Sequence, residues 1–116
     1  MSKVTIYHNP RCSKSRQTLA LLQEHGIEPE VIPYLQNPPD AHTLERLLQL
    51  LQLKPRALMR RKEAPYEALG LDDETLSDAA LIEAMVANPV LIERPIVVKG
   101  SRAVLGRPPE NVLDLI

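Results

Sequence analysis

The sequence lacks several residues on which common protein classes depend. It has one cysteine, no tryptophan and no phenylalanine, and aromatic residues make up 3% of its 116 positions. A lone cysteine cannot form an internal disulfide, which favours a reducing compartment and predicts a cytoplasmic protein. With so few aromatic side chains for base stacking, we expect no nucleic-acid partner. The core must be built from Leu, Ile, Val and Ala.

Long apolar runs and clusters of metal ligands are missing as well. No stretch approaches the roughly 20 apolar residues that span a bilayer, and no signal-peptide pattern opens the chain, so we expect no membrane association. His8, His25 and His42 are too widely spaced to form a zinc site with the single cysteine. Neither a Walker loop nor a dinucleotide fingerprint is present. We therefore expect no metal and no bound cofactor.

Positive charge is concentrated in three segments of the chain. The formal net charge is −1, yet all but one of the 14 lysines and arginines fall in residues 1–16, 54–62 and 94–107, and these segments contain no acid. If the fold brings the segments together, one face would carry a positive potential suited to an anion. The alternative is that each segment is only a solvated surface.

Hydrophobic periodicity predicts an α/β fold in one domain spanning residues 1–116. A β-branched strand over Val4–Tyr7, a helix over about 13–25 and a second short strand over 30–34 form a right-handed parallel βαβ unit. Residues 96–105 predict a hairpin that is broken at its centre by Gly-Ser. A terminal helix follows it, from Pro108-Pro109 to about Leu115.

Between these halves, residues of about 40–88 predict a helical insertion. Asp40 and Ser77 are good N-caps for two helices, of which the first has leucines at helical spacing. A short helix between the two would place Arg56 and Arg60 four positions apart on one face. The predicted order is therefore βαβ, a helical middle, then ββα.

The candidate site is the segment His8-Asn9-Pro10-Arg11-Cys12-Ser13-Lys14-Ser15-Arg16. Its cysteine falls where the first strand ends and the first helix begins. The first turn of a helix offers unpaired N–H donors and the positive end of a dipole, both of which favour a thiolate or a bound anion. We therefore expect Cys12 to be reactive; the alternative is a small buried hydrophobic residue.

Two neighbours of the cysteine have predicted roles in the same chemistry. Ser15 comes three residues after Cys12, where its Oγ could turn back toward the sulfur. It occupies the second position of a Cys-x-x-Cys motif, so disulfide chemistry would need an outside thiol such as glutathione or a partner protein. His8 could steer the loop or the thiol proton, or simply cap the strand. A phosphatase loop is excluded because Cys-x5-Arg would require arginine at Thr18.

Four segments together resemble the glutaredoxin-linked arsenate reductases. The resemblance covers essentially the whole chain and rests on His8-Asn9-Pro10-x-Cys12-x-x-Ser15-Arg16, Tyr34-Leu35-x-Asn37-Pro38-Pro39, Pro65-Tyr66-Glu67-x-Leu69-Gly70-Leu71 and Arg94-Pro95-Ile96-Val97-Val98. It implies a thioredoxin-like fold, with a mixed sheet and a helical insertion between its two halves. It also implies a structural role for Pro95, with a cis peptide bond before it.

The same resemblance implies an enzyme and assigns its residues. Cys12 would be the nucleophile that attacks arsenate, and His8 and Ser15 would assist its thiolate. The arginines that bind the oxyanion would be Arg60, Arg94 and Arg107. Glutathione would be the co-substrate and glutaredoxin the protein partner, and the product would be arsenite.

Two alternatives to this assignment stay open. Ser13-Lys14 follows the cysteine, where the arsenate reductases of this family carry Gly-Thr. A thiol-dependent oxidoreductase of the same fold, acting on another oxyanion or on a mixed disulfide, is compatible with that difference. A redox-sensing binding protein, like the regulators of similar fold that contact RNA polymerase, is the third hypothesis.

Overall fold

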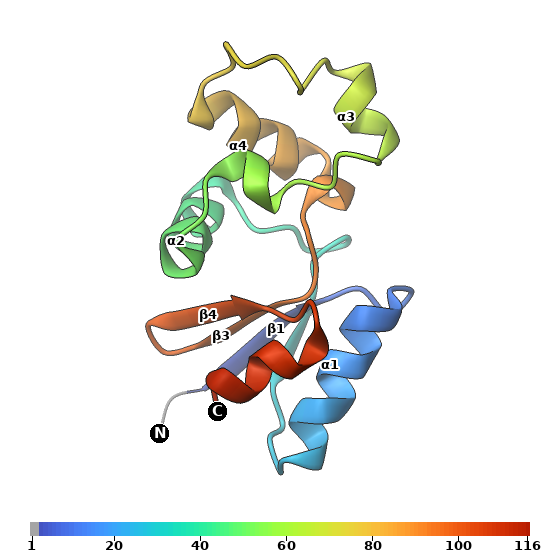
Figure 1. Cartoon of the computed structure of the whole chain (residues 1–116), viewed down its shortest axis with the longest axis vertical. Helices are drawn as coiled ribbons and strands as arrows, with labels where there is room; N and C mark the ends of the chain where they lie inside the picture. The colour runs from blue at the N-terminus through green and yellow to red at the C-terminus, as the bar shows by residue number, and fades with distance from the viewer. Residues whose placement is uncertain (1–2) are drawn as a thin grey trace. The chain divides into compact units, whose positions relative to one another are not determined.

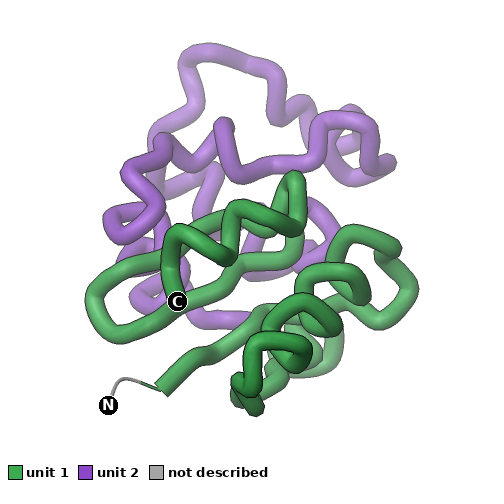
Figure 2. Tube along the Cα trace, turned by 60° about the horizontal axis from the view of Figure 1, so that its bottom comes forward, with its two compact units in different colours: residues 1–37, 94–116 green, residues 38–93 purple. Residues whose placement is uncertain are grey.

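The computed structural model describes residues 3–116 as two units. The first, which we call the sheet unit, comprises residues 3–37 and 94–116; the second, the helical unit, comprises residues 38–93. Figure 2 colours them green and purple. No helix among the described residues is long and apolar enough to cross a membrane.

The sheet unit is built on a mixed four-stranded sheet with the strand order β2-β1-β3-β4 (Figure 1). β1 (Val4–His8) pairs in parallel with β2 (Glu30–Pro33), and α1 (Ser13–Glu24) connects them. On its other side β1 pairs antiparallel with β3 (Ile96–Lys99), which forms a hairpin with β4 (Arg102–Leu105). The predicted βαβ unit and the predicted hairpin are both confirmed.

The strand register brings four parts of the chain to one edge of this sheet. His8 lies opposite Pro33, Tyr7 opposite Ile96, and Ile96 opposite Leu105. Parallel strands end at the same edge, and an antiparallel strand begins where its neighbour ends. The segments that follow β1, β2 and β4, and the segment that precedes β3, therefore meet at one edge, which we call the site edge.

One face of the sheet carries the core of the sheet unit. Alternate residues of β1 are buried, as expected for a strand with one covered face. Figure 1 shows α1 and the C-terminal 3₁₀ helix η3 (Pro109–Asp114) side by side against the sheet. The terminal helix lies where it was predicted. The core consists of aliphatic side chains from all of these elements: Val4, Ile6, Leu22, Val97, Val112 and Leu115.

Two helices of the helical unit begin at the predicted N-cap residues. Asp40 and Ser77 each accept a hydrogen bond from the backbone N–H three residues later, at 2.8 and 3.1 Å, and so begin two of its helices. The first of these helices buries leucines at positions 44, 47 and 48. The elements of the unit are α2 (Ala41–Leu51), η1 (Pro55–Leu58), α3 (Ala64–Ala68), α4 (Asp78–Ala87) and η2 (Pro89–Leu91).

One predicted helix of this unit begins at Pro55 as expected but ends before it reaches Arg60. The 3₁₀ turn η1 ends at Leu58, and Met59 instead forms an antiparallel bridge with Ile92. Arg60 lies outside η1 and donates its backbone N–H to the Leu91 carbonyl at 2.7 Å, so Arg56 and Arg60 do not share a helix face. Arg56 donates to two backbone carbonyls at 3.0 and 2.8 Å. A pairing between residues 33 positions apart has therefore overridden a local helical preference.

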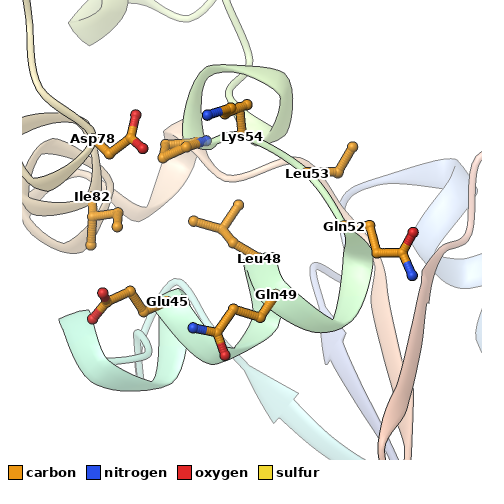
Figure 3. Close-up of a pocket in the computed structure, with 9 residues that line it drawn as sticks. Glu45, Leu48, Gln49, Gln52, Leu53, Lys54, Asp78 and Ile82 are labelled. Carbon is orange, nitrogen blue, oxygen red and sulfur yellow. The ribbon is translucent and has the colours of Figure 1, made fainter.

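The helical unit also has an open groove of about 400 Å³ between α2, η1 and α4 (Figure 3). Its walls combine leucine and isoleucine with carboxylate, amide and one lysine side chain. The lining residues include no cysteine, histidine or arginine; they are Glu45, Leu48, Gln49, Gln52, Leu53, Lys54, Pro55, Asp78 and Ile82.

Helix α1 is fixed to the site edge by a close contact with Gly106. The buried Thr18 Oγ1 donates to the Lys14 carbonyl at 2.7 Å and lies 3.3 Å from the Gly106 carbonyl oxygen. A Cβ atom at Gly106 would come within 2.5 Å of Thr18 Oγ1 and 2.8 Å of Pro95 Cγ. The absence of a side chain at this position is what allows the helix to approach.

Gly106→Ala should therefore destabilise the protein by about 1–3 kcal/mol, because the added methyl group overpacks a buried contact. Urea unfolding followed by circular dichroism measures the change. The matched control is Thr18→Ala, alone and combined with Gly106→Ala, since it removes two of the three closest atoms. The double variant should lose less stability than the sum of the single variants. Strict additivity would contradict this contact.

Candidate functional site

Cys12 lies at the N-cap of α1, on the site edge, as predicted. Its backbone is extended, with φ −92° and ψ 123°, and its N–H donates to the Asn9 carbonyl at 3.0 Å. This bond closes the turn that Asn9-Pro10 makes after β1. The cysteine is a partly exposed free thiol, so a reactant can reach it.

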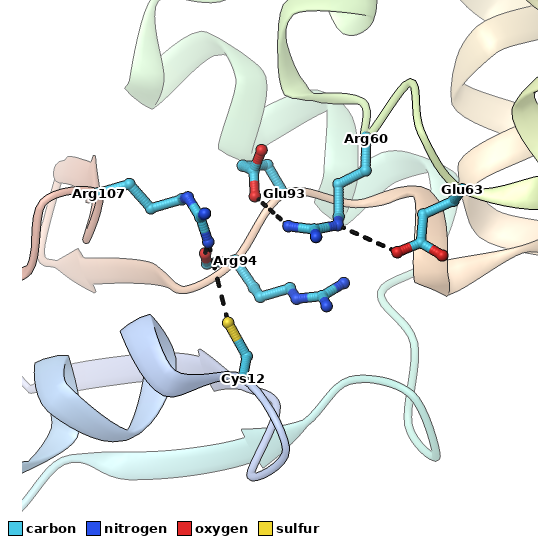
Figure 4. A network of polar contacts seen from close by, with 6 residues as sticks. All are labelled: Cys12, Arg60, Glu63, Glu93, Arg94 and Arg107. Carbon is cyan, nitrogen blue, oxygen red and sulfur yellow. Dashed lines mark hydrogen bonds and ion pairs between the residues drawn. The ribbon is translucent and has the colours of Figure 1, made fainter.

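The Cys12 thiol is surrounded by hydrogen-bond donors. Burial raises the pKa of the Cys12 thiol, but the backbone N–H of Ser15, the guanidinium of Arg94 and the backbone N–H of Lys14 outweigh it and lower that pKa. Arg107 Nη1 donates toward Cys12 Sγ at 3.8 Å (Figure 4). These donors stabilise the thiolate, the nucleophilic form of cysteine.

Ser15 acts differently from the prediction. Its Oγ is fully buried, lies 2.6 Å from His8 Nδ1, and accepts a hydrogen bond from the Asn9 N–H at 3.0 Å. The expectation that Oγ turns back toward the sulfur is wrong, because these two partners already occupy it. Ser15 reaches Cys12 through its backbone N–H instead. The side chain holds the loop together, and the main chain supports the thiolate.

His8 is held as a neutral side chain at the end of β1. Only 8% of it is exposed, and burial lowers the pKa of its imidazole, with a further contribution from the positive charge of Arg16. Arg16 Nη1 donates to the Pro10 carbonyl at 2.9 Å, across the turn. His8 and Arg16 thus both stabilise the loop, His8 through Ser15 Oγ and Arg16 through the Pro10 carbonyl.

Arg94, which precedes β3, and Arg107, which follows β4, both have side chains that contact the Cys12 thiol. The Nε and Nη1 atoms of Arg94 are buried, and its side chain contacts both Cys12 and Tyr34. Burial alone would lower the pKa of Arg94, but these contacts raise it. Arg107 Nη1 also donates to the Arg94 carbonyl at 3.2 Å. The peptide bond before Pro95 is cis, as the resemblance implied, and so is the bond after Arg107.

Arg60 belongs to the helical unit, where two carboxylates engage its guanidinium. Its Nη1 donates to Glu93 Oε1 at 2.7 Å and its Nε to Glu63 Oε1 at 3.4 Å (Figure 4). Its backbone N–H donates to the Leu91 carbonyl at 2.7 Å. Sequence reasoning missed both acids. The three-residue spacing of Arg60 and Glu63 is the signal that could have pointed to one of them.

Two cations of the basic segments in the sheet unit, Lys3 and Arg102, lie away from the thiol. Lys3 precedes β1 and pairs with Glu30 at 3.5 Å, and Arg102 donates to the Asp114 carbonyl at 2.9 Å. Both positions are at the sheet edge opposite the site edge. Arg94 and Arg107 are the arginines of these segments whose side chains contact the Cys12 thiol. Within residues 3–116 no group of three or more His, Cys, Asp or Glu side chains is arranged to hold a metal ion.

Comparison with known proteins identifies the family. Residues 7–115 match the ArsC family. YfgD of Escherichia coli, an uncharacterized protein, is 58% identical over 98% of this chain and 97% of its own length. An arsenate reductase of Acidiphilium multivorum is 47% identical over the whole chain and 82% of its own length. The structure of an arsenate reductase from Vibrio cholerae superposes with a TM-score of 0.97 at 55% identity, over 99% of this chain and 98% of that one.

This chain belongs to the ArsC family. The sheet order and connections fit the thioredoxin-like α/β fold that the sequence predicted.

The contacts of the thiol give a first prediction about the site. Arg94→Ala removes a donor from the Cys12 thiolate, so the pKa of the thiol should rise and alkylation by iodoacetamide at pH 7 should slow by roughly threefold or more. The pH dependence of the alkylation rate measures both. Arg11→Ala is the matched control, because Arg11 is an exposed cation one residue from Cys12. This variant should leave the pH dependence of the alkylation rate unchanged. Equal shifts in both variants would indicate a general charge effect instead.

The buried imidazole gives a second prediction. Because the pKa of His8 lies below 6.5 in the folded protein, the unfolded chain takes up this proton first as the pH falls. The contribution of His8 to stability is therefore present above about pH 6.5 and is lost below it. NMR titration of the imidazole carbons should locate the lowered pKa, and Arg16→Gln should raise it. A midpoint for His8 above 6.5 would contradict the burial argument.

Proposed function

We propose that this protein reduces arsenate to arsenite, with Cys12 as the nucleophile. The observation that carries the proposal is the thiol itself, whose pKa is lowered by the first turn of α1 and by Arg94, with Arg107 beside it. Relatives covering the whole chain at about half identity are named arsenate reductases, which supports arsenate as the substrate.

The proposed reaction begins with the oxyanion against the arginines. Planar guanidinium groups suit the oxygens of a tetrahedral anion, and Arg94 and Arg107 are the two that contact Cys12. Arg60 is the third ligand that the family resemblance implies, and within the helical unit its guanidinium is engaged by Glu93 and Glu63. The Cys12 thiolate attacks arsenic, the As–S bond forms, and a protonated oxygen leaves as water.

Reduction then requires thiols from outside the chain. The glutathione thiol attacks arsenic and displaces a second oxygen, which leaves as water. The thiolate of glutaredoxin then attacks the glutathione sulfur. The bond between that sulfur and arsenic breaks, and both of its electrons stay on arsenic, which becomes arsenic(III). The two outside thiols are oxidised to a mixed disulfide, and water releases arsenite and the Cys12 thiolate.

The need for an external thiol follows from the cysteine count. The sequence holds one cysteine, and the position of a resolving cysteine is taken by Ser15, whose Oγ is engaged by His8 and Asn9. A glutathione-dependent cycle also places the protein in a reducing compartment, for which we propose the cytoplasm. Glutaredoxin is the proposed partner.

Steady-state assays with arsenate, glutathione and glutaredoxin test the proposal. Wild type should produce arsenite, and Cys12→Ser should produce none, because serine cannot form the adduct at neutral pH. Arg107→Ala should raise the arsenate KM by roughly tenfold or more through loss of a charge-assisted hydrogen bond. Arg102→Ala, from the far end of the same hairpin, is the matched control and should behave as wild type.

The outcomes separate the competing functions. Arsenite production by Cys12→Ser would overturn the assignment of the nucleophile. Activity with thioredoxin, but none with glutaredoxin, would overturn the choice of partner. No arsenite from wild type, together with a Cys12 that cycles through a glutathione mixed disulfide, would identify a thiol oxidoreductase acting on another substrate.

A further inference from the structure

Tyr34 is a buried tyrosine at the site edge. It follows β2 directly, and β2 flanks β1, from which the Cys12 loop emerges. Only 1% of the residue is exposed, and its hydroxyl oxygen is among the buried polar atoms. A buried phenol hydroxyl is costly unless it has a polar partner. The nature of that partner therefore matters.

Tyr34 interacts electrostatically with the guanidinium of Arg94. Arg94 precedes β3, on the opposite side of β1 from β2, and strands separated by one strand lie roughly 10 Å apart. An arginine that contacts both Tyr34 and Cys12 must extend across the end of β1. Its Nε and Nη1 are buried along the way. Figure 4 shows this side chain leaving the backbone above the Cys12 loop.

The two contacts of Arg94 have different chemical consequences. A guanidinium is a planar fork of five N–H donors without acceptors, so fixing one edge of the fork also fixes the direction of the other. The phenol oxygen can accept from one N–H of the fork, which leaves other N–H groups for the sulfur. Without such an anchor, a long side chain loses rotamer entropy each time it meets the thiolate.

We propose that Tyr34 is a positioning residue of this site: its hydroxyl anchors the Arg94 guanidinium across the end of β1, so that Arg94 faces Cys12 and any anion bound there. This proposal rests on the proposed function only in taking Cys12 as the reactive group. It requires neither arsenate nor glutaredoxin. It also assigns a role to a residue that does not itself touch the sulfur.

The test is the alkylation profile of Cys12 in Tyr34→Phe. This variant keeps the ring in the core and deletes one oxygen. The pKa of the thiol should rise, and the alkylation rate at pH 7 should fall by roughly two- to fivefold, the scale of one lost hydrogen bond. Tyr66→Phe is the matched control, because Tyr66 is also a buried tyrosine but belongs to α3 of the helical unit. It should leave the profile unchanged.

A thermodynamic cycle then distinguishes positioning from simple packing. In an Arg94→Gln background, Tyr34→Phe should produce no further shift, because the residue through which Tyr34 acts is gone. Arg94→Lys should shift the profile on its own, since one ammonium cannot contact both partners at once. If Tyr34→Phe folds poorly, Arg94→Lys still tests the two-contact geometry.

Two results would overturn the proposal: an unchanged profile in Tyr34→Phe, or a shift of equal size with and without Arg94. Neither depends on arsenate turnover, because the titration uses the free enzyme. If arsenate is not the substrate but the cycle shows coupling, the role of Tyr34 stands and the proposed function fails. If arsenate turnover is normal but Tyr34→Phe shows no coupling to Arg94, the proposed function stands and the role of Tyr34 fails.

Discussion

The site depends on the way β1 is paired, parallel to β2 on one side and antiparallel to β3 on the other. This mixed pairing alone brings the ends of three strands and the start of a fourth to a single edge. Cys12, Tyr34, Arg94 and Arg107 come from four separate segments, and none of the four strands contributes more than its end. The backbone pairing of the sheet therefore determines which segments of the chain surround the thiol, whatever side chains they carry.

Around the thiol, two opposing effects are balanced. Partial burial disfavours the charged form of Cys12, and donors from the α1 main chain and from Arg94 more than compensate. The main-chain donors come with the helix itself and need no particular side chain at Ser13 or Lys14. Ser-Lys at these positions is therefore compatible with a stabilised thiolate.

Local features of the fold were predictable, whereas contacts between distant residues were not. The caps at Asp40 and Ser77 depend on partners three residues away, and the periodicity of the strands and of α1 lies within short windows. The helix expected at Arg60 failed because Met59 pairs with Ile92 far along the chain. For the site, the position of Cys12 could be predicted, but not the direction of the Ser15 hydroxyl or the acids on Arg60. Each of these is decided by which polar group is packed nearby after folding.

The position of the helical unit in the chain determines how a change in its length would affect the sheet. The chain leaves the sheet unit after β2 and returns before β3. Residues 38–93 therefore form one continuous segment between two strands that are not neighbours in the sheet. Insertions or deletions within that segment leave every strand pairing in register, because long connections between fixed ends cost little extra entropy as they lengthen. A change of length in this segment therefore need not move the thiol or the two arginines beside it, all three of which belong to the sheet unit.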